Sequence, residues 1–215
     1  MSQDFKVRMI RVKGHPVSEA YANYCAKTWS QFNFRFHDAT TPETLYQEQG
    51  LTFGKKGDKE LTDTEKACFY SQYNLWKKCA IENKPILVLE HDAYLEKPDA
   101  ISFNEHLDVQ FFGQHSMEAV MFHPRFARKL MSYTQRNAVT GPMSLVDQLL
   151  GFFRKDKQSR YGVPHARYQG TFAPVRSVFD PNLGNTIDHE NKSLTDRVKN
   201  GDADLFKIIN LEIKR

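Results

Sequence analysis

Apolar and polar residues alternate along the chain with the spacing of strands and then of helices. The segment 5–12 (FKVRMIRV) alternates apolar and charged positions as a strand does. The segment 32–42 (FNFRFHDATTP) predicts a second strand that ends in a polar loop. Between them, Ser18 is expected to cap a helix that runs to about Gln31. This succession of strand-like and helix-like segments favours a single α/β sheet.

The clearest helical signal follows a segment rich in glycine and charge, residues 50–60, which predicts a mobile loop. Thr62 with Glu65 three residues later has the spacing of a capping box, which orders the first turn of a helix. Apolar residues then recur at helical spacing: Phe69, Tyr73, Trp76 and Ala80. The sequence therefore predicts a long amphipathic helix that begins near Thr62.

Further elements are predicted in the second half of the chain. Residues 109–112 (VQFF) and 118–122 (EAVMF) favour short strands. His123 and Pro124 begin a helix, since proline suits the first helical turn. The segment 144–153 (SLVDQLLGFF) predicts another amphipathic helix. No repeat or linker interrupts the pattern, so we expect one domain over residues 1–215.

Composition places the chain among ordinary globular proteins. It has 215 residues, of which 40% are hydrophobic and 26% charged. The apolar runs are too short to predict a membrane span, and the first residues lack a secretory signal pattern. Three widely spaced cysteines, Cys25, Cys68 and Cys79, contain no CxxC pair. These features favour reduced thiols and a cytoplasmic location.

The segment 83–98 (NKPILVLEHDAYLEKP) carries the most specific chemical signal, because the apolar strand Ile86–Leu89 ends in Glu90, His91 and Asp92. Ligands of open α/β sheets bind beyond the carboxyl ends of the strands. If the chain stays extended, the two carboxylates project to the same side and suit Mg²⁺ or Mn²⁺, and the imidazole would favour manganese. The alternative, in which the glutamate caps the next turn and the aspartate is solvated, stays open on these residues alone.

Positive charge is concentrated in one part of the chain. The net charge is +4, and residues 121–176 hold ten Lys or Arg against two acids. This segment is either a solvated basic face or a surface for an anion: a diphosphate, a nucleic acid or a charged glycan. The basic residues that could steer phosphates are Arg125, Arg128, Arg154, Lys155 and Lys157.

The order of these motifs resembles glycosyltransferase family 25, the lipooligosaccharide galactosyltransferase family that also includes collagen glycosyltransferases. That family has a helix with Glu, Cys, Ser and Trp, followed by an aliphatic strand that ends in Glu-Asp-Asp. The matching positions here are Glu65, Cys68, Ser71, Trp76, Glu90, His91 and Asp92. The chain departs from the family twice: His91 replaces the central acid of Glu-Asp-Asp, and Gln72 stands where the family has histidine after serine.

Later segments continue the resemblance in the same order, so that it covers about residues 5–180 and leaves 181–215 as a tail. GPMSLVDQLL supplies an aspartate, Asp147, where the family has one. The segment that begins at Tyr161 (YGVPHARYQGTFAPVRS) has the family's later residues. These residues are Tyr161, Pro164, Gln169 and Ser177.

The resemblance implies a GT-A-like fold of Rossmann type, with one mixed, mostly parallel sheet between helices. It also implies a UDP-sugar donor, a divalent cation (Mn²⁺ or Mg²⁺) and transfer of a hexose with inversion. Residues expected at the donor and metal site are Asp38, Glu90, His91, Asp92, Arg154, Gln169 and His189. Asp147 is the candidate base that activates the acceptor hydroxyl, or else simply a favourable charge at a helix N-terminus.

Other functions stay open beside this one. The chain could bind a nucleotide sugar without catalysis, or act as a metal-dependent phosphoesterase or nuclease with the same carboxylates. The acceptor is also open. A phosphorylated lipooligosaccharide would suit the basic segment, and so would DNA whose hydroxymethylated base is flipped into a pocket.

Overall fold

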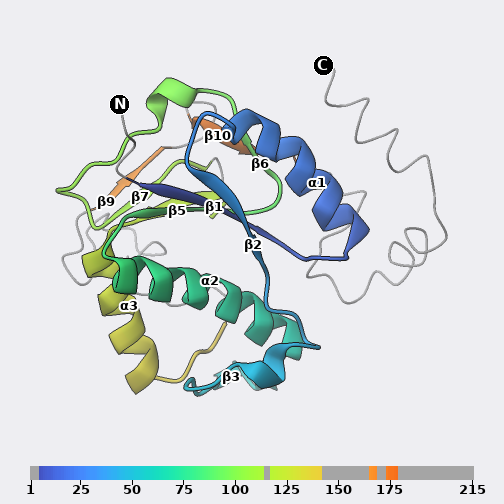
Figure 1. The fold of residues 1–215 in the computed structure, drawn as a ribbon. Coiled ribbons are helices and arrows are strands. Elements are labelled where there is room, and N and C mark those ends of the chain that lie inside the picture. Colours follow the sequence, from blue (N-terminus) through green and yellow to red (C-terminus); the bar gives the residue numbers. More distant parts are fainter. Residues whose placement is uncertain (1–4, 114–116, 142–164, 169–172, 179–215) are drawn as a thin grey trace.

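The computed structural model describes residues 5–113, 117–141, 165–168 and 173–178 (Figure 1). Its main sheet has six strands in the order β2-β1-β5-β8-β7-β9. These strands are β1 (Lys6–Arg11), β2 (Phe34–Asp38), β5 (Ile86–Leu89), β7 (Val109–Phe111), β8 (Ala119–Phe122) and β9 (His165–Arg167). Two small sheets pair β3 (Lys55–Lys56) with β4 (Lys59–Glu60), and β6 (Ala93–Leu95) with β10 (Val175–Ser177).

Within the described ranges, three α-helices cover the main sheet: α1 (Pro16–Ala26), α2 (Asp63–Glu82) and α3 (Pro124–Arg136). Figure 1 shows α2 and α3 on one face of the sheet and α1 on the other. Short 3₁₀ helices form at η1 (Lys27–Trp29), η2 (Leu45–Gln47) and η3 (Pro98–Ala100). None of the helices in the described ranges is both long and apolar enough to cross a membrane.

The sheet is mixed. Strand β1 runs parallel to β2 and β5, and β7 runs parallel to β9. Strand β8 runs antiparallel to both of its neighbours, β5 and β7. The expected α/β class, with a mixed, mostly parallel sheet flanked by helices, is therefore confirmed.

Strand β5 lies at the centre of the core, and all four of its side chains are buried. Ile86 and Val88 pack in the apolar cluster formed with α2 and α3. Leu87 and Leu89 point to the other face and pack in the cluster formed with α1. Burial on both faces explains why this strand is a continuous aliphatic run and does not alternate with polar residues.

The predicted starts of two helices are confirmed. The hydroxyl of Thr62 accepts a hydrogen bond from the backbone N–H of Glu65 at 3.2 Å, and the Glu65 carboxylate accepts from the N–H of Thr62 at 3.0 Å. This reciprocal pair is the predicted capping box of α2. Helix α3 begins after His123, whose Nδ1 accepts from the N–H of Arg125 at 3.1 Å.

The first helix differs from its prediction at both ends. Its N-cap is His15, whose Nδ1 accepts from the N–H of Ser18 at 3.3 Å, so Ser18 is not the cap. Ser18 is instead buried, and its hydroxyl accepts from the N–H of Val12 at 2.9 Å. The α-helix ends at Ala26 and continues only as the 3₁₀ turn to Trp29.

The segment 50–60 is also more ordered than a mobile loop. It contains the β3–β4 hairpin, and Gly54 donates its N–H to the carbonyl of Val139 at 2.9 Å. Phe53 packs against the rings of Phe69 and Tyr70 on α2. The predicted helix 144–153 lies outside the described residues, and the single-domain assignment stays a prediction.

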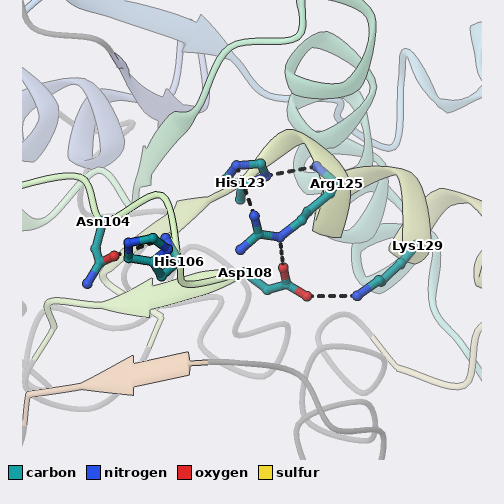
Figure 2. Close-up of polar contacts among 6 residues, drawn as sticks. All are labelled: Asn104, His106, Asp108, His123, Arg125 and Lys129. Carbon is teal, nitrogen blue, oxygen red and sulfur yellow. Dashed lines mark hydrogen bonds and ion pairs between the residues drawn. The ribbon is translucent and has the colours of Figure 1, made fainter.

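One buried carboxylate joins β7 to α3 (Figure 2). The side chain of Asp108, 1% exposed, accepts hydrogen bonds from Arg125 Nε and from Lys129 Nζ, the latter at 2.8 Å. Burial alone would raise the pKa of Asp108, but the hydrogen bonds and charges of Lys129 and Arg125 outweigh it and hold this pKa below its usual value. The ion pairs thus fix the start of α3 at one end of the sheet.

Replacing Asp108 by Asn should lower the free energy of unfolding by about 2 kcal/mol at pH 7, because two hydrogen bonds to a charged group are lost. A lowered pKa in the folded state means that this stability is present above the ordinary aspartate pKa, about 4, and is lost as the pH falls through the folded-state value. Urea unfolding at pH 7 and in the acid range should therefore show a difference that shrinks below about pH 4.

The exposed residue Asp99 provides the matched control, since Asp99→Asn should leave the urea midpoint unchanged at every pH. Equal stability of Asp108→Asn and the wild type at pH 7 would contradict the role given to this carboxylate.

Candidate functional site

The carboxyl ends of β1, β2 and β5 meet at one edge of the sheet. Arg11 pairs with Asp38 in the register of β1 and β2, and Met9 pairs with Leu89 in the register of β1 and β5. At this edge Asp38 accepts a hydrogen bond from Arg11 Nε at 3.0 Å and lies 3.8 Å from Lys13 Nζ. Its side chain is 46% exposed, so Asp38 is a partly solvated ion-pair partner at the rim.

The chain turns sharply where β5 ends. The carbonyl of Glu90 accepts the N–H of Ala93 at 3.1 Å, which closes a reverse turn over His91 and Asp92. The expectation of an extended chain from Glu90 to Asp92 is therefore wrong. The two carboxylates are neighbours because of the turn and not because of strand alternation.

Asp92 is buried, with 6% of its surface exposed. Its Oδ2 accepts a hydrogen bond from the hydroxyl of Ser177 on β10, whereas its Oδ1 is buried without a hydrogen-bond partner. Its backbone carbonyl accepts the N–H of Val178 at 3.0 Å. The alternative of a solvated Asp92 does not hold, because strand β10 covers it.

Glu90 has a strongly perturbed carboxyl group. Burial, followed by the negative charges of Asp92 and Glu118, raises the pKa of Glu90 to about 8. Glu118 is itself buried and precedes β8, and its carbonyl accepts the N–H of Glu90 at 3.0 Å. Three carboxylates thus share a poorly solvated site at the end of β5.

The position of Glu118 depends on the antiparallel course of β8, which sets Ala119 opposite Leu89. Its side chain lies over Gly113: a Cβ atom at residue 113 would be 2.2 Å from Glu118 Oε2. Glu118 is not among the site residues predicted from the sequence. The available signal was an acid directly before an apolar strand, but its relevance requires the direction of that strand.

His91 packs against α1. Its ring centroid lies 5.8 Å from that of Tyr21. Burial lowers the pKa of His91, the nearby His15 lowers it further, and Asp92 opposes both. The neutral imidazole that results retains a nitrogen lone pair, as metal coordination requires.

The N-terminal half of α2 borders the same site. The hydroxyl of Ser71 accepts the N–H of Thr40 at 3.0 Å and donates to the carbonyl of Ala67 at 2.9 Å, which ties α2 to the loop after β2. Burial, and next the charge of Glu90, raise the pKa of Cys68 to about 12. Cys68 therefore lies near Glu90 but is a protonated thiol with no nucleophilic character.

Two of the basic residues expected to steer phosphates lie at the other end of the sheet. Phe122 pairs with Ile86 at the start of β5, so α3 begins far from Glu90. There Arg125 is bound to Asp108, and Arg128 Nη1 donates to the Ala80 carbonyl at 3.3 Å. The remaining predicted residues lie outside the described part of the chain: Asp147, Arg154, Lys155, Lys157, Gln169 and His189.

The described residues contain no ready-made cluster of three or more metal-binding side chains. Magnesium and manganese sites that also bind a diphosphate need fewer, since one or two carboxylates are completed by phosphate oxygens and water. Glu90 and Asp92 fit that pattern. The Oδ1 of Asp92, buried without a hydrogen-bond partner, is an oxygen that a cation would bind, and the same cation would displace the proton that the raised pKa leaves on Glu90 at neutral pH.

Comparison with known proteins identifies the family of the chain. The family model described as glycosyltransferase family 25 (LPS biosynthesis protein) matches residues 19–144, more than half of the chain. No curated protein sequence matches the chain significantly. Among solved structures, a glycosyltransferase involved in the glycosylation of the major capsid of PBCV-1 has 10% identity and a TM-score of 0.45, over 77% of this chain and 81% of that one. The match over residues 19–144 includes α2, β5 and the acidic turn formed by Glu90, His91 and Asp92. This glycosyltransferase chain belongs to glycosyltransferase family 25.

Proposed function

We propose that this glycosyltransferase moves a hexose from a UDP-sugar to an acceptor hydroxyl, and that the donor binds beyond the carboxyl ends of β1, β2 and β5. The observation that carries the proposal is the group of three carboxyls at this edge, Glu90, Asp92 and Glu118, of which the last two are buried and all three act on the pKa of Glu90 or carry it. Buried carboxylates crowded together cost folding free energy, and such arrangements occur where function requires them. Family membership supplies the class of reaction.

The donor would be held through a divalent cation, with Glu90 and Asp92 as oxygen ligands. His91, neutral and adjacent to them, is a possible nitrogen ligand, and His189 a further one. When bound, the cation would neutralise charge on the departing diphosphate. The charge of Glu118 also acts on Glu90, where it contributes to the raised pKa after burial and Asp92.

Other donor contacts are proposed from the family pattern. Asp38 lies at the same edge of the sheet, where Arg11 and Lys13 hold its carboxylate in place. In this position it would bind the nucleoside. Arg154 and Gln169 would complete the donor site. For an inverting reaction the acceptor hydroxyl attacks opposite the leaving UDP, and Asp147 would accept its proton.

The acceptor proposed here is a lipooligosaccharide-type glycan, as the family description suggests. A DNA acceptor was expected to contact basic residues between 121 and 176. Within the described part of that segment, Arg125 and Lys129 are bound to Asp108, and Arg128 donates to Asn83 Oδ1 at 3.1 Å. No described contact favours DNA over a glycan, so only the glycan is proposed.

Glu90→Gln and Asp92→Asn should each reduce transfer by a factor on the order of 10² or more, since each removes a charge that the bound donor requires. Neither should unfold the protein, because the changes remove charge from a crowded acidic site. Product formation from UDP-galactose and UDP-glucose, measured by mass spectrometry beside circular dichroism, tests this. Glu105→Gln, at an exposed site, is the control. Near-wild-type transfer by Asp92→Asn would remove the donor-site assignment.

Transfer should require a divalent cation. Excess EDTA should abolish it, and Mn²⁺ should restore it at least as well as Mg²⁺, because His91 offers a nitrogen ligand. Titration of each metal into the apo protein, followed by the rate of UDP release, measures the preference. Full transfer in excess EDTA would show that the acidic turn works without a metal.

Gly113→Ala should weaken transfer without touching a proposed ligand. The added Cβ would collide with Glu118 and force its carboxylate away from Glu90. If the effect passes through this contact, Gly113→Ala should cause no further loss of transfer in a protein that already carries Glu118→Ala, as a comparison of the double variant with each single variant would show. Wild-type kinetics in Gly113→Ala would exclude a role for the Glu118 position.

A further inference from the structure

Gln72 in α2 carries a buried polar atom with no partner. The residue is 2% exposed, and its side-chain oxygen Oε1 lies below the surface without a hydrogen bond. A buried acceptor without a donor destabilises a folded protein, and native structures rarely contain one without a reason. In the protein without ligand, Gln72 therefore holds a buried hydrogen-bond acceptor that has no donor.

Gln72 lies in the half of α2 that borders the proposed donor site, so its missing hydrogen-bond donor concerns this site. Helix α2 runs from the site toward the start of β5, where Cys79 Sγ donates to the carbonyl of Phe122 at 3.4 Å. Cys68, one turn before Gln72 on the same side of the helix, lies within the electrostatic field of Glu90. Helical side chains lean toward the helix N-terminus, so the side chain of Gln72 is expected to extend toward the turn of α2 that contains Cys68.

The helix is held firmly at this point. Ser71, directly before Gln72, binds the backbone of Thr40 in the loop that follows β2. The unpartnered Oδ1 of Asp92 lies in the turn on the other side of Glu90. Two buried acceptors without donors therefore lie on two elements that carry the site, α2 and the turn after β5.

We infer that Gln72 is a donor-binding residue whose Oε1 accepts a hydrogen bond from a hydroxyl of the sugar in the UDP-sugar. This inference rests on the proposed function. An amide oxygen can only accept, so its partner in the ligand must be an O–H or N–H group. The diphosphate offers none. The uridine offers ribose hydroxyls and a base N–H, and the sugar offers several hydroxyls on the other side of the diphosphate, close to the bond that breaks. With the diphosphate held at Glu90 and Asp92, and the nucleoside at Asp38 as proposed, the sugar hydroxyls are the donors assigned to Gln72. Gln72 would thus help to select and orient the sugar, and not the nucleotide.

A purely structural account exists, and it makes opposite predictions. Trp76, one turn after Gln72, is fully buried and its indole Nε1 also lacks a hydrogen-bond partner. If a small rotation joined this N–H to Gln72 Oε1, the glutamine would serve the core. Removing the amide would then destabilise the fold and leave ligand binding unchanged.

The test replaces Gln72 by Met, which keeps the shape and removes the acceptor, with Gln72→Leu as a second variant. Under our inference the free protein melts about 2–4 °C higher, because an unmet polar group is removed. In isothermal titration calorimetry with Mn²⁺, the Kd of UDP-galactose or UDP-glucose rises about 3- to 10-fold, as expected for one lost hydrogen bond. The Kd of UDP stays unchanged.

Gln110 provides a matched control, because it is a buried glutamine whose amide is satisfied. Its Oε1 accepts the N–H of Asn104 at 2.9 Å, and its Nε2 donates to the carbonyl of Ser102 at 3.2 Å. Gln110→Met should lower the melting temperature and leave both Kd values unchanged. Opposite changes in melting temperature, an increase for Gln72→Met and a decrease for Gln110→Met, would distinguish an acceptor that serves a ligand from one that stabilises the fold.

Three results would overturn the inference. A lower melting temperature of Gln72→Met with an unchanged Kd for the UDP-sugar would assign the amide to Trp76. An equal loss of affinity for UDP and for the UDP-sugar would move the contact to the nucleotide. If the wild-type protein bound UDP but neither UDP-sugar, the proposed donor would be wrong, and the inference would fail with it. The first two results would contradict only the role of Gln72 and leave the proposed donor unaffected.

Discussion

The structure depends on the burial of β5 on both faces. Its four aliphatic side chains divide between two apolar clusters, one under α2 and α3 and one under α1. Such a strand can expose no polar side chain along its length, so the first groups able to do chemistry are those that follow Leu89. The site lies where it does because the core ends there.

The neighbours of β5 then determine what surrounds that point. Parallel pairing with β1 brings the rim residue Asp38 to the same edge, whereas antiparallel pairing with β8 brings in Glu118. Strand β10, far away in the sequence, supplies the hydroxyl of Ser177 that holds Asp92. The surroundings of Glu90 and Asp92 thus come from parallel and antiparallel neighbours in the main sheet and from β10 of the small β6–β10 sheet.

Features that depend on neighbouring residues could be predicted from the sequence, whereas features that depend on pairing between distant strands could not. The capping box of α2, the start of α3 at His123 and the aliphatic strand β5 depend on residues a few positions apart, and all three are confirmed. Histidine at the cap of α1 was missed because serine, three residues later, is the more common capping residue.

The site illustrates the same limit. The residues Glu90 and Asp92 stand out in the sequence, but the turn between them, the burial of Asp92 and the approach of Glu118 arise from strands that pair across the sheet. Asp147, Arg154, Gln169 and His189 stay predictions from the family pattern.

The carboxyl groups at the two ends of the sheet are balanced in different ways. At one end two cations hold the pKa of Asp108 low, and at the other burial and neighbouring carboxylates hold the pKa of Glu90 high. With a pKa of about 8, Glu90 retains a proton in the free protein at neutral pH. A cation bound at Glu90 would displace this proton, so its affinity should increase as the pH rises toward 8.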